Sequence, residues 1–295
     1  MGNPPVPSAD QIISALSSTG FLFEQKAANI LEDTETGWAF KDPDLGTSRE
    51  IDLFKVGSVY DHDQKYRTFE ISWYILGECK NYQWPWVALT KPWGARRWFL
   101  TSDDLSLTQA MRFHLGIDDE GMALANRDEE TFFQGYQRVR AEALPRAVQL
   151  VKLNKKSGGW DAASGDIFND VTYPLAKASN FLKTRFDDRQ EQGYLGSSRE
   201  MQVIFPVLVV SSQIYAVSAN GDPEVKEVGQ VTLERTLSSE NVSGRFRIDV
   251  VHIDHLRDWY EQRVRSVVDY LADSLTFSNE GLRGVKDSFR RSSGS

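Results

Sequence analysis

An acid and a base separated by one residue, Glu78 and Lys80, close an apolar run of the chain. Residues 69–80 are predicted to form a strand, in which Glu78 and Lys80 share one face while Cys79 points to the other. Upstream, Asp52 lies between two apolar residues in a second predicted strand, with its side chain on the face opposite to both. If the two strands are neighbours in a sheet, the carboxylates of Asp52 and Glu78 converge.

Two converging carboxylates provide the hard oxygen ligands that Mg²⁺ or Mn²⁺ prefers. A bound ion of this kind lowers the pKa of its water and stabilises charge on a phosphate, while an ammonium such as Lys80 can position the water or neutralise the transition state. Glu24 adds a third carboxylate at the edge of the buried side of a predicted helix. The alternative interpretation is that Glu78 and Lys80 pair only with each other, and that Glu24 caps its helix or makes a local ion pair.

The phrases GFLFEQKAANILED, SREIDLF and ILGECKNY, in this order, resemble the restriction-endonuclease-like PD-(D/E)xK superfamily and its predicted prokaryotic nucleases. The resemblance implies a divalent-metal-dependent hydrolysis of nucleic-acid phosphodiesters on a mixed central sheet flanked by helices. Asp52 and Glu78 match the metal ligands of that family, Lys80 the catalytic lysine, and Glu24 the helix acid that some branches use as a further catalytic or metal-binding group. Glu50 and Ile51 replace the proline that precedes the first acid.

The periodicity of apolar residues predicts an α/β fold. Helices are expected at residues 8–19 and 22–33, followed by strands at 38–40, 51–56, 69–80 and 97–100. Helical spacing then predicts long helices at 128–153 and 165–186, before strands at 203–210, 214–217, 228–235 and 245–253 and an amphipathic helix. Pro206 within the strand at 203–210 favours an edge position or a bulge.

These elements predict four segments along the chain. Residues 1–103 are the N-terminal part of a nuclease-like core, 104–200 a helical insertion or subdomain, 201–276 the strands and helix that complete the core, and 277–295 a flexible tail.

Charge is unevenly distributed along the sequence. The formal net charge of -8 argues against a wholly basic nucleic-acid-binding surface. One stretch nevertheless carries six basic residues and one acid, and it is the expected contact with nucleic acid: Arg138, Arg140, Arg146, Lys152, Lys155 and Lys156. A second basic cluster lies in the tail. A solvated face without a ligand is the alternative interpretation of both.

Several classes of protein are disfavoured by the sequence. A single cysteine rules out an intrachain disulfide or a zinc site of the Cys-pair type and favours a cytoplasmic protein. No signal-peptide pattern opens the chain and no apolar stretch is long enough to span a bilayer, so a membrane role is not expected. Motifs of the Walker or dinucleotide-binding type are absent, which disfavours a nucleotide motor.

The predicted function is therefore a metal-dependent endonuclease, with DNA as the expected substrate and defence or repair as the expected setting. A homodimer is one arrangement that would let a protein with a single site cut both strands of a duplex. The competing hypothesis is a non-catalytic nucleic-acid-binding or assembly module on the same fold, because folds outlive activities.

Overall fold

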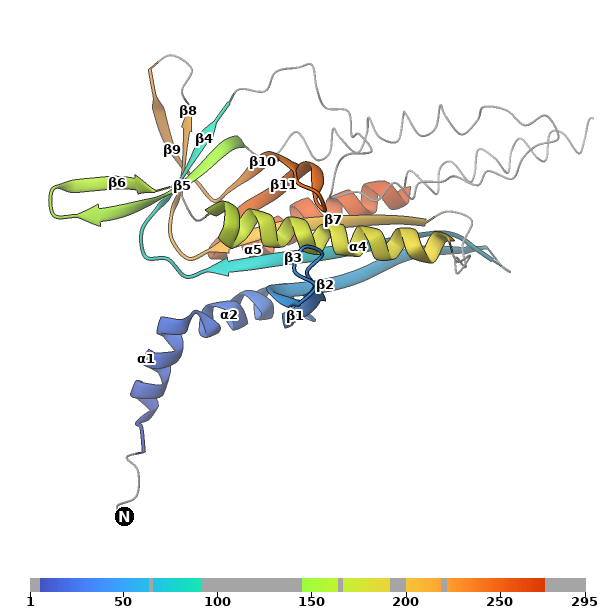
Figure 1. Cartoon of the computed structure of the whole chain (residues 1–295), viewed down its shortest axis with the longest axis horizontal. Coiled ribbons are helices and arrows are strands. Elements are labelled where there is room, and N and C mark those ends of the chain that lie inside the picture. Colours follow the sequence, from blue (N-terminus) through green and yellow to red (C-terminus); the bar gives the residue numbers. More distant parts are fainter. Residues whose placement is uncertain are drawn as a thin grey trace, which may run out of the picture.

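The computed structural model describes residues 6–63, 66–91, 145–163, 167–191, 200–218 and 222–273. Within these ranges the chain is an α/β protein built on one mixed sheet of eleven strands (Figure 1). The strand order is β1-β2-β3-β7-β11-β10-β5-β4-β8-β9, and β6 pairs with β5 outside this path. The predicted α/β class and mixed sheet are confirmed.

The first two helices follow the local signals of the sequence. The side chain of Ser8 accepts a hydrogen bond from the backbone N–H of Gln11, whose own side chain accepts one from the backbone N–H of Ser8, and this capping box starts α1 (Ala9–Thr19). Gly20, with φ of 87°, ends α1 and leads directly into α2 (Phe21–Leu31). Both predicted helices are therefore confirmed, and Figure 1 shows α1 extending away from the sheet.

The strands that carry the candidate residues lie together at one end of the sheet order. Antiparallel pairing joins β1 (Glu35–Lys41) to β2 (Ser48–Asp63) and β2 to β3 (Tyr66–Lys80). The far edge of β3 pairs in parallel with β7 (Glu200–Val210), which in turn pairs in parallel with β11 (Ser243–His252). The strands predicted at 51–56 and 69–80 are thus neighbours, as the convergence of their acids requires.

The remaining strands complete the sheet beyond β11. They are β4 (Trp86–Thr90), β5 (Arg146–Lys156), β6 (Gly159–Ala163), β8 (Ile214–Ser218), β9 (Glu224–Val228) and β10 (Gln230–Ser238).

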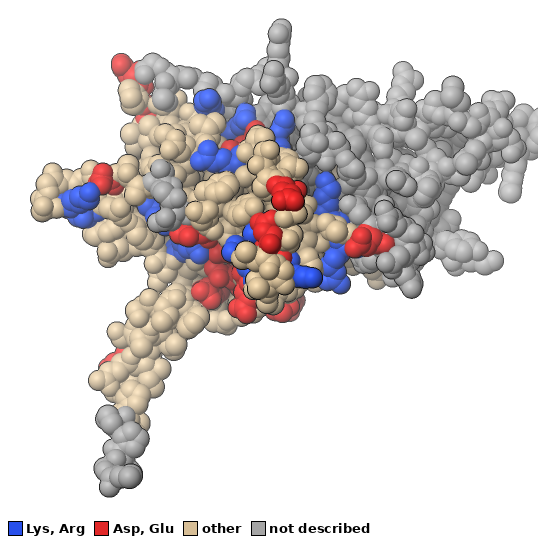
Figure 2. All heavy atoms as spheres, in the orientation of Figure 1, with Lys and Arg blue, Asp and Glu red and all other residues tan. Residues whose placement is uncertain are grey.

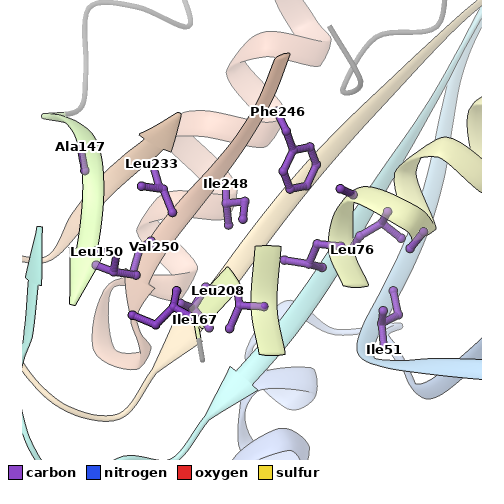
Figure 3. Packing of buried hydrophobic residues seen from close by; sticks show 14 of the residues in the cluster. Ile51, Leu76, Ala147, Leu150, Ile167, Leu208, Leu233, Phe246, Ile248 and Val250 are labelled. Atoms are coloured by element: carbon purple, nitrogen blue, oxygen red, sulfur yellow. The ribbon is translucent and has the colours of Figure 1, made fainter. Parts of the chain in front are cut away.

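Helices cover both faces of the sheet and bury a separate hydrophobic cluster on each. On one face, α2 and the C-terminal helical segments pack over β3 and β7. These segments are η2 (Ile253–His255), α5 (Leu256–Trp259) and η3 (Tyr260–Arg265), continued as helix to residue 273. On the other face, η1 (Phe168–Thr172) and α4 (Tyr173–Glu191) cover a cluster that includes Ile51, Leu76 and Leu208 (Figure 3). No helix among the described residues is long and apolar enough to cross a membrane.

The helix predicted at 128–153 is wrong in the part that the structure describes, where β5 and β6 form a hairpin instead. Ala147, Leu150 and Val151 are buried at helical spacing, but this spacing arises because the pairing of β5 with β4 shifts register near Val148. The helix predicted at 165–186 is confirmed by η1 and α4. The strand predicted at 97–100, the tail at 277–295 and residues 92–144 of the predicted insertion lie outside the described residues.

The expectation for Pro206 is also wrong, because β7 lies in the interior of the sheet between β3 and β11. Pro206 pairs with Leu76 of β3, whereas the pairing of β7 with β11 begins only at Val207. A proline is tolerated here because the ladder to β11 has not yet started at its position.

Close approach of β2 and β3 at Gly77 generates a prediction about stability. A Cβ atom at Gly77 would lie 2.9 Å from the Cβ of Leu53, which is fully buried. Gly77→Ala is therefore expected to lower the free energy of unfolding by about 1–3 kcal/mol through overpacking. Urea denaturation measures this change, and Gly158→Ala, at a position open on all sides, is the matched control. Equal stability of the two variants would show that β2 can move away from β3 without cost.

Candidate active site

The regular alternation of side chains in β2 is interrupted at Asp52. Ile51 belongs to the cluster beneath α4, while Leu53, two residues on, belongs to the cluster beneath α2, so the two lie on opposite faces of the sheet. In a regular strand they would share a face. Opposite this irregularity β1 contains Gly37, with φ of 69°, a left-handed conformation that favours glycine. The expectation that Asp52 faces away from both neighbours is therefore wrong, because these neighbours do not share a face.

Because of this interruption, the side chain of Asp52 takes the place of a backbone hydrogen-bond acceptor for β3. The ladder between β2 and β3 ends at the pair of Leu53 and Gly77, although β3 continues to Lys80 against β7. The backbone N–H of Cys79 donates to the carboxylate of Asp52 instead, with an N···Oδ2 distance of 2.7 Å. A charge-assisted hydrogen bond of this length holds the acid beside the last three residues of the strand. Sequence spacing gives no indication of this contact.

Glu78 is a buried acid in contact with a second acid. Its residue is only 6% exposed. Burial is the main reason that the pKa of Glu78 is raised from 4.5 to about 7, and the negative charge of Asp52, which also lies within hydrogen-bonding reach, raises it further. Lys80 acts in the opposite direction but does not compensate for both effects. Near neutral pH this carboxyl group therefore exchanges a proton readily.

Lys80 is the cation of this cluster. Its Nζ donates to Oε2 of Glu78 at 2.9 Å. Burial acts to lower the pKa of Lys80 and is the largest single effect, but Glu78 and Asp52 together raise it above the ordinary lysine value. Lys80 therefore stays protonated and serves as an electrostatic group or hydrogen-bond donor, not as a base.

Glu24 approaches the same cluster from α2. It lies in the first turn of this helix, after Gly20, and its backbone N–H donates to the carbonyl of Gly20 at 3.1 Å. Partial burial raises the pKa of Glu24, the charge of Asp52 raises it further, and Lys80 lowers it. The structure thus brings Asp52 of β2 into contact with β3, which supplies Glu78 and Lys80, and places Glu24 of α2 near enough for the charges of Asp52 and Lys80 to affect it.

The carboxylate oxygens of the cluster are suitable ligands for a divalent ion, although the described residues do not form a complete set of ligands around one point. Among the described residues, no group of three His, Cys, Asp or Glu side chains is arranged to hold a metal. Mg²⁺ needs fewer protein ligands, because it keeps several waters and commonly takes one or two carboxylates. Asp52 and Glu78 provide two in contact, and their mutual repulsion is what a cation would relieve. Binding requires Glu78 to lose its proton and to exchange Lys80 for the ion.

The structure describes the predicted basic stretch only in part. Arg146 pairs with Glu234 of β10 and is held at the sheet. Lys152, Lys155 and Lys156 lie on the hairpin formed by β5 and β6, whereas Arg138 and Arg140 fall outside the described residues. The prediction therefore divides into a structural arginine and a lysine-bearing hairpin. The basic residues of the tail likewise lie outside the described ranges.

The raised pKa of Glu78 predicts a pH-dependent stability. A carboxyl group with a higher pKa in the folded than in the unfolded state stabilises the fold fully below pH 4.5, and this contribution is lost as pH rises through about 7. Glu78→Gln keeps the shape of the side chain but cannot ionise, so the variant should not lose stability in this way. The difference in unfolding free energy, variant minus wild type, should therefore rise by up to about 3 kcal/mol between pH 5 and pH 8. Urea denaturation at both values measures the difference. An equal offset at pH 5 and pH 8 would contradict the assigned environment of Glu78.

Comparison of the chain with protein-family models, with curated proteins and with solved structures finds no match.

Proposed function

We propose that this protein is a divalent-metal-dependent nuclease of the PD-(D/E)xK type, which hydrolyses phosphodiester bonds of nucleic acid, with DNA as the expected substrate. One observation carries the proposal. A buried acid with a pKa of about 7, Glu78, contacts a second acid, Asp52, and an ammonium, Lys80, where the ladder between β2 and β3 ends. Two carboxylates in contact, one of them with a perturbed pKa, are an arrangement that Mg²⁺ sites use.

Each side chain has a distinct role in this proposal. Asp52 and Glu78 hold Mg²⁺ or Mn²⁺ through carboxylate oxygens, and Asp52 is oriented for this by the N–H of Cys79. When bound, the ion supplies an activated water and neutralises charge on the phosphate. Lys80, released from Glu78, donates to the attacking water or to a phosphate oxygen as negative charge develops. Glu24 completes the ligand set directly or through a water.

Charge balance supports an ion in addition to the lysine. Lys80 is paired with Glu78 and affects the charge of Glu24, yet both of these acids have raised pKa values despite its presence. Burial is the main cause of both shifts, and the charge of Asp52 adds to each, which indicates negative charge at the site that the lysine does not fully offset. Figure 2 shows acidic side chains gathered where α2 joins the body of the molecule.

A non-catalytic nucleic-acid-binding or assembly module is the second candidate. Two observations favour it: the net charge of -8, and the lack of a closed three-ligand metal site among the described residues. The lysine next to paired acids favours the enzyme, because a module that only binds does not need a buried acid in contact with a second acid.

Cleavage assays on variants of the candidate residues test the proposal. Purified protein with Mg²⁺ or Mn²⁺ is expected to cut plasmid, single-stranded DNA or RNA, and Lys80→Ala should reduce the rate by about 10²- to 10⁴-fold while metal binding persists. Asp52→Asn retains an oxygen for the N–H of Cys79 but should weaken both metal binding and cleavage. Glu24→Gln should be milder if Glu24 acts through a water, and as severe as Asp52→Asn if it binds the ion directly.

The chain offers a matched control for the acid-x-lysine spacing. Glu224 and Lys226 repeat this spacing on β9, an exposed edge strand. Lys226→Ala should leave cleavage and metal binding unchanged. Wild-type cleavage by folded Lys80→Ala, or an equal loss in Lys226→Ala, would refute the proposed role of Lys80.

A further inference from the structure

The β5–β6 hairpin extends beyond the body of the sheet. Pairing of β5 with β4 ends at Lys152, and the last four residues of β5 pair only with β6. Figure 1 shows this hairpin projecting from the sheet, and Figure 2 shows basic side chains on the same projection. By strand alternation the hairpin has two faces.

Aromatic and basic side chains are divided between these faces. Lys155 pairs across the hairpin with Trp160, so the two share a face, and the lysine Nζ lies 4.8 Å from the indole centroid. Lys152 and Lys156 belong to the opposite face by strand alternation. There Lys156 is paired with Asp161, and Lys152 lies over the rings of Tyr82 and Trp86. Of these two faces, as far as the structure describes them, the Trp160 face is the one that carries a lysine over an exposed ring.

Trp160 packs against a second tryptophan. Trp84 contacts Trp160 edge to face, with the ring centroids 5.5 Å apart and the planes at 84°. Trp160 is nevertheless 51% exposed, which is unusual for so large an apolar side chain. An indole that is half exposed, contacts a neighbouring ring and has an ammonium over its ring offers a surface on which a base can stack next to a phosphate.

Tyr82 connects this surface to the candidate active site. It follows Lys80 by two residues, and its hydroxyl donates to the carbonyl of Leu153 at 3.1 Å and also bonds the side chain of Asn154. The base of the hairpin is thus fixed to the segment that leaves the acid cluster.

We propose that Trp84, Lys155 and Trp160 form a stacking platform for single-stranded nucleic acid. Bases stack on Trp160, and Lys155 contacts the adjoining phosphate. A paired base inside a duplex does not expose its flat face, so the platform selects single strands, overhangs or unpaired ends. This inference rests on the proposed function for the identity of the ligand, but it concerns binding and not cleavage.

Binding measured in EDTA separates the platform from the metal site. Fluorescence anisotropy of a labelled 15-nucleotide oligo(dT), and of a duplex of the same length, gives the affinity without cleavage. Trp160→Ala should weaken single-strand binding about 5- to 100-fold, Trp160→Phe should retain most of it, and duplex binding should change by less than about threefold. Lys155→Ala should reduce the slope of log affinity against log salt by about 0.7.

Phe168→Ala is the matched aromatic control. Phe168 is 45% exposed and stacks on Tyr173, so it resembles Trp160 in exposure and in having a ring partner, but it lies in η1. The platform is supported if Phe168→Ala binds like wild type while Trp160→Ala does not. It is overturned if Trp160→Ala binds oligo(dT) like wild type, if single-strand and duplex binding fall together, or if wild type does not bind oligo(dT).

The results expected if the proposed nuclease activity fails differ from those expected if the platform fails. Trp160-dependent binding in EDTA without any metal-dependent cleavage would support the platform and refute the nuclease. Cleavage that depends on Lys80, together with binding that Trp160→Ala does not change, would support the nuclease and refute the platform.

Discussion

The candidate site depends on one hydrogen bond, from the backbone N–H of Cys79 to the carboxylate of Asp52. Strand β2 stops pairing with β3 at Leu53, so the end of β3 lacks a backbone acceptor on that side. The carboxylate of Asp52 takes this place and cannot turn away from Glu78 without leaving an N–H unsatisfied. A structural requirement of the sheet therefore holds two acids together, and this contact adds to the effect of burial in raising the pKa of Glu78.

The rest of the fold keeps this arrangement rigid. Residues of β3 and β7 alternate between two hydrophobic clusters, one beneath α2 and α5 and one beneath α4, so the strand that carries Glu78 is packed from both sides. Gly77 allows Leu53 to approach closely immediately before the acid cluster. Confinement of this kind prevents Glu78 from moving toward solvent to escape Asp52. An unfavourable local contact that a rigid surrounding structure maintains is characteristic of functional sites.

Much of this arrangement could be predicted from the sequence, and the failures share a physical cause. The capping box at Ser8, the glycine at position 20 and the strand periodicity of residues 69–80 are local signals, and they identified α1, α2 and β3. Strand β5 was predicted as a helix because a register shift near Val148 places buried residues at helical spacing. The break at Asp52 has the same character, since it depends on how β1, β2 and β3 fit together. Neither irregularity is encoded in a short segment, so each becomes visible only in the assembled sheet. The candidate residues could be named in advance, but the hydrogen bond that holds Asp52 and the aromatic partners of the hairpin lysines could not.

Proton release on metal binding is the most direct test of the central proposal, in which Asp52 and Glu78 form a divalent-cation site that is partly protonated near neutral pH because Glu78 is buried and contacts Asp52. Calorimetric titration with Mn²⁺ in two buffers of different ionisation enthalpy gives the number of protons released per ion. With a pKa of about 7 for Glu78, the account predicts release of about 0.9 proton at pH 6, about half a proton at pH 7 and almost none at pH 8.5. Binding without pH-dependent proton release, or no Mn²⁺ binding at pH 8.5, would contradict it.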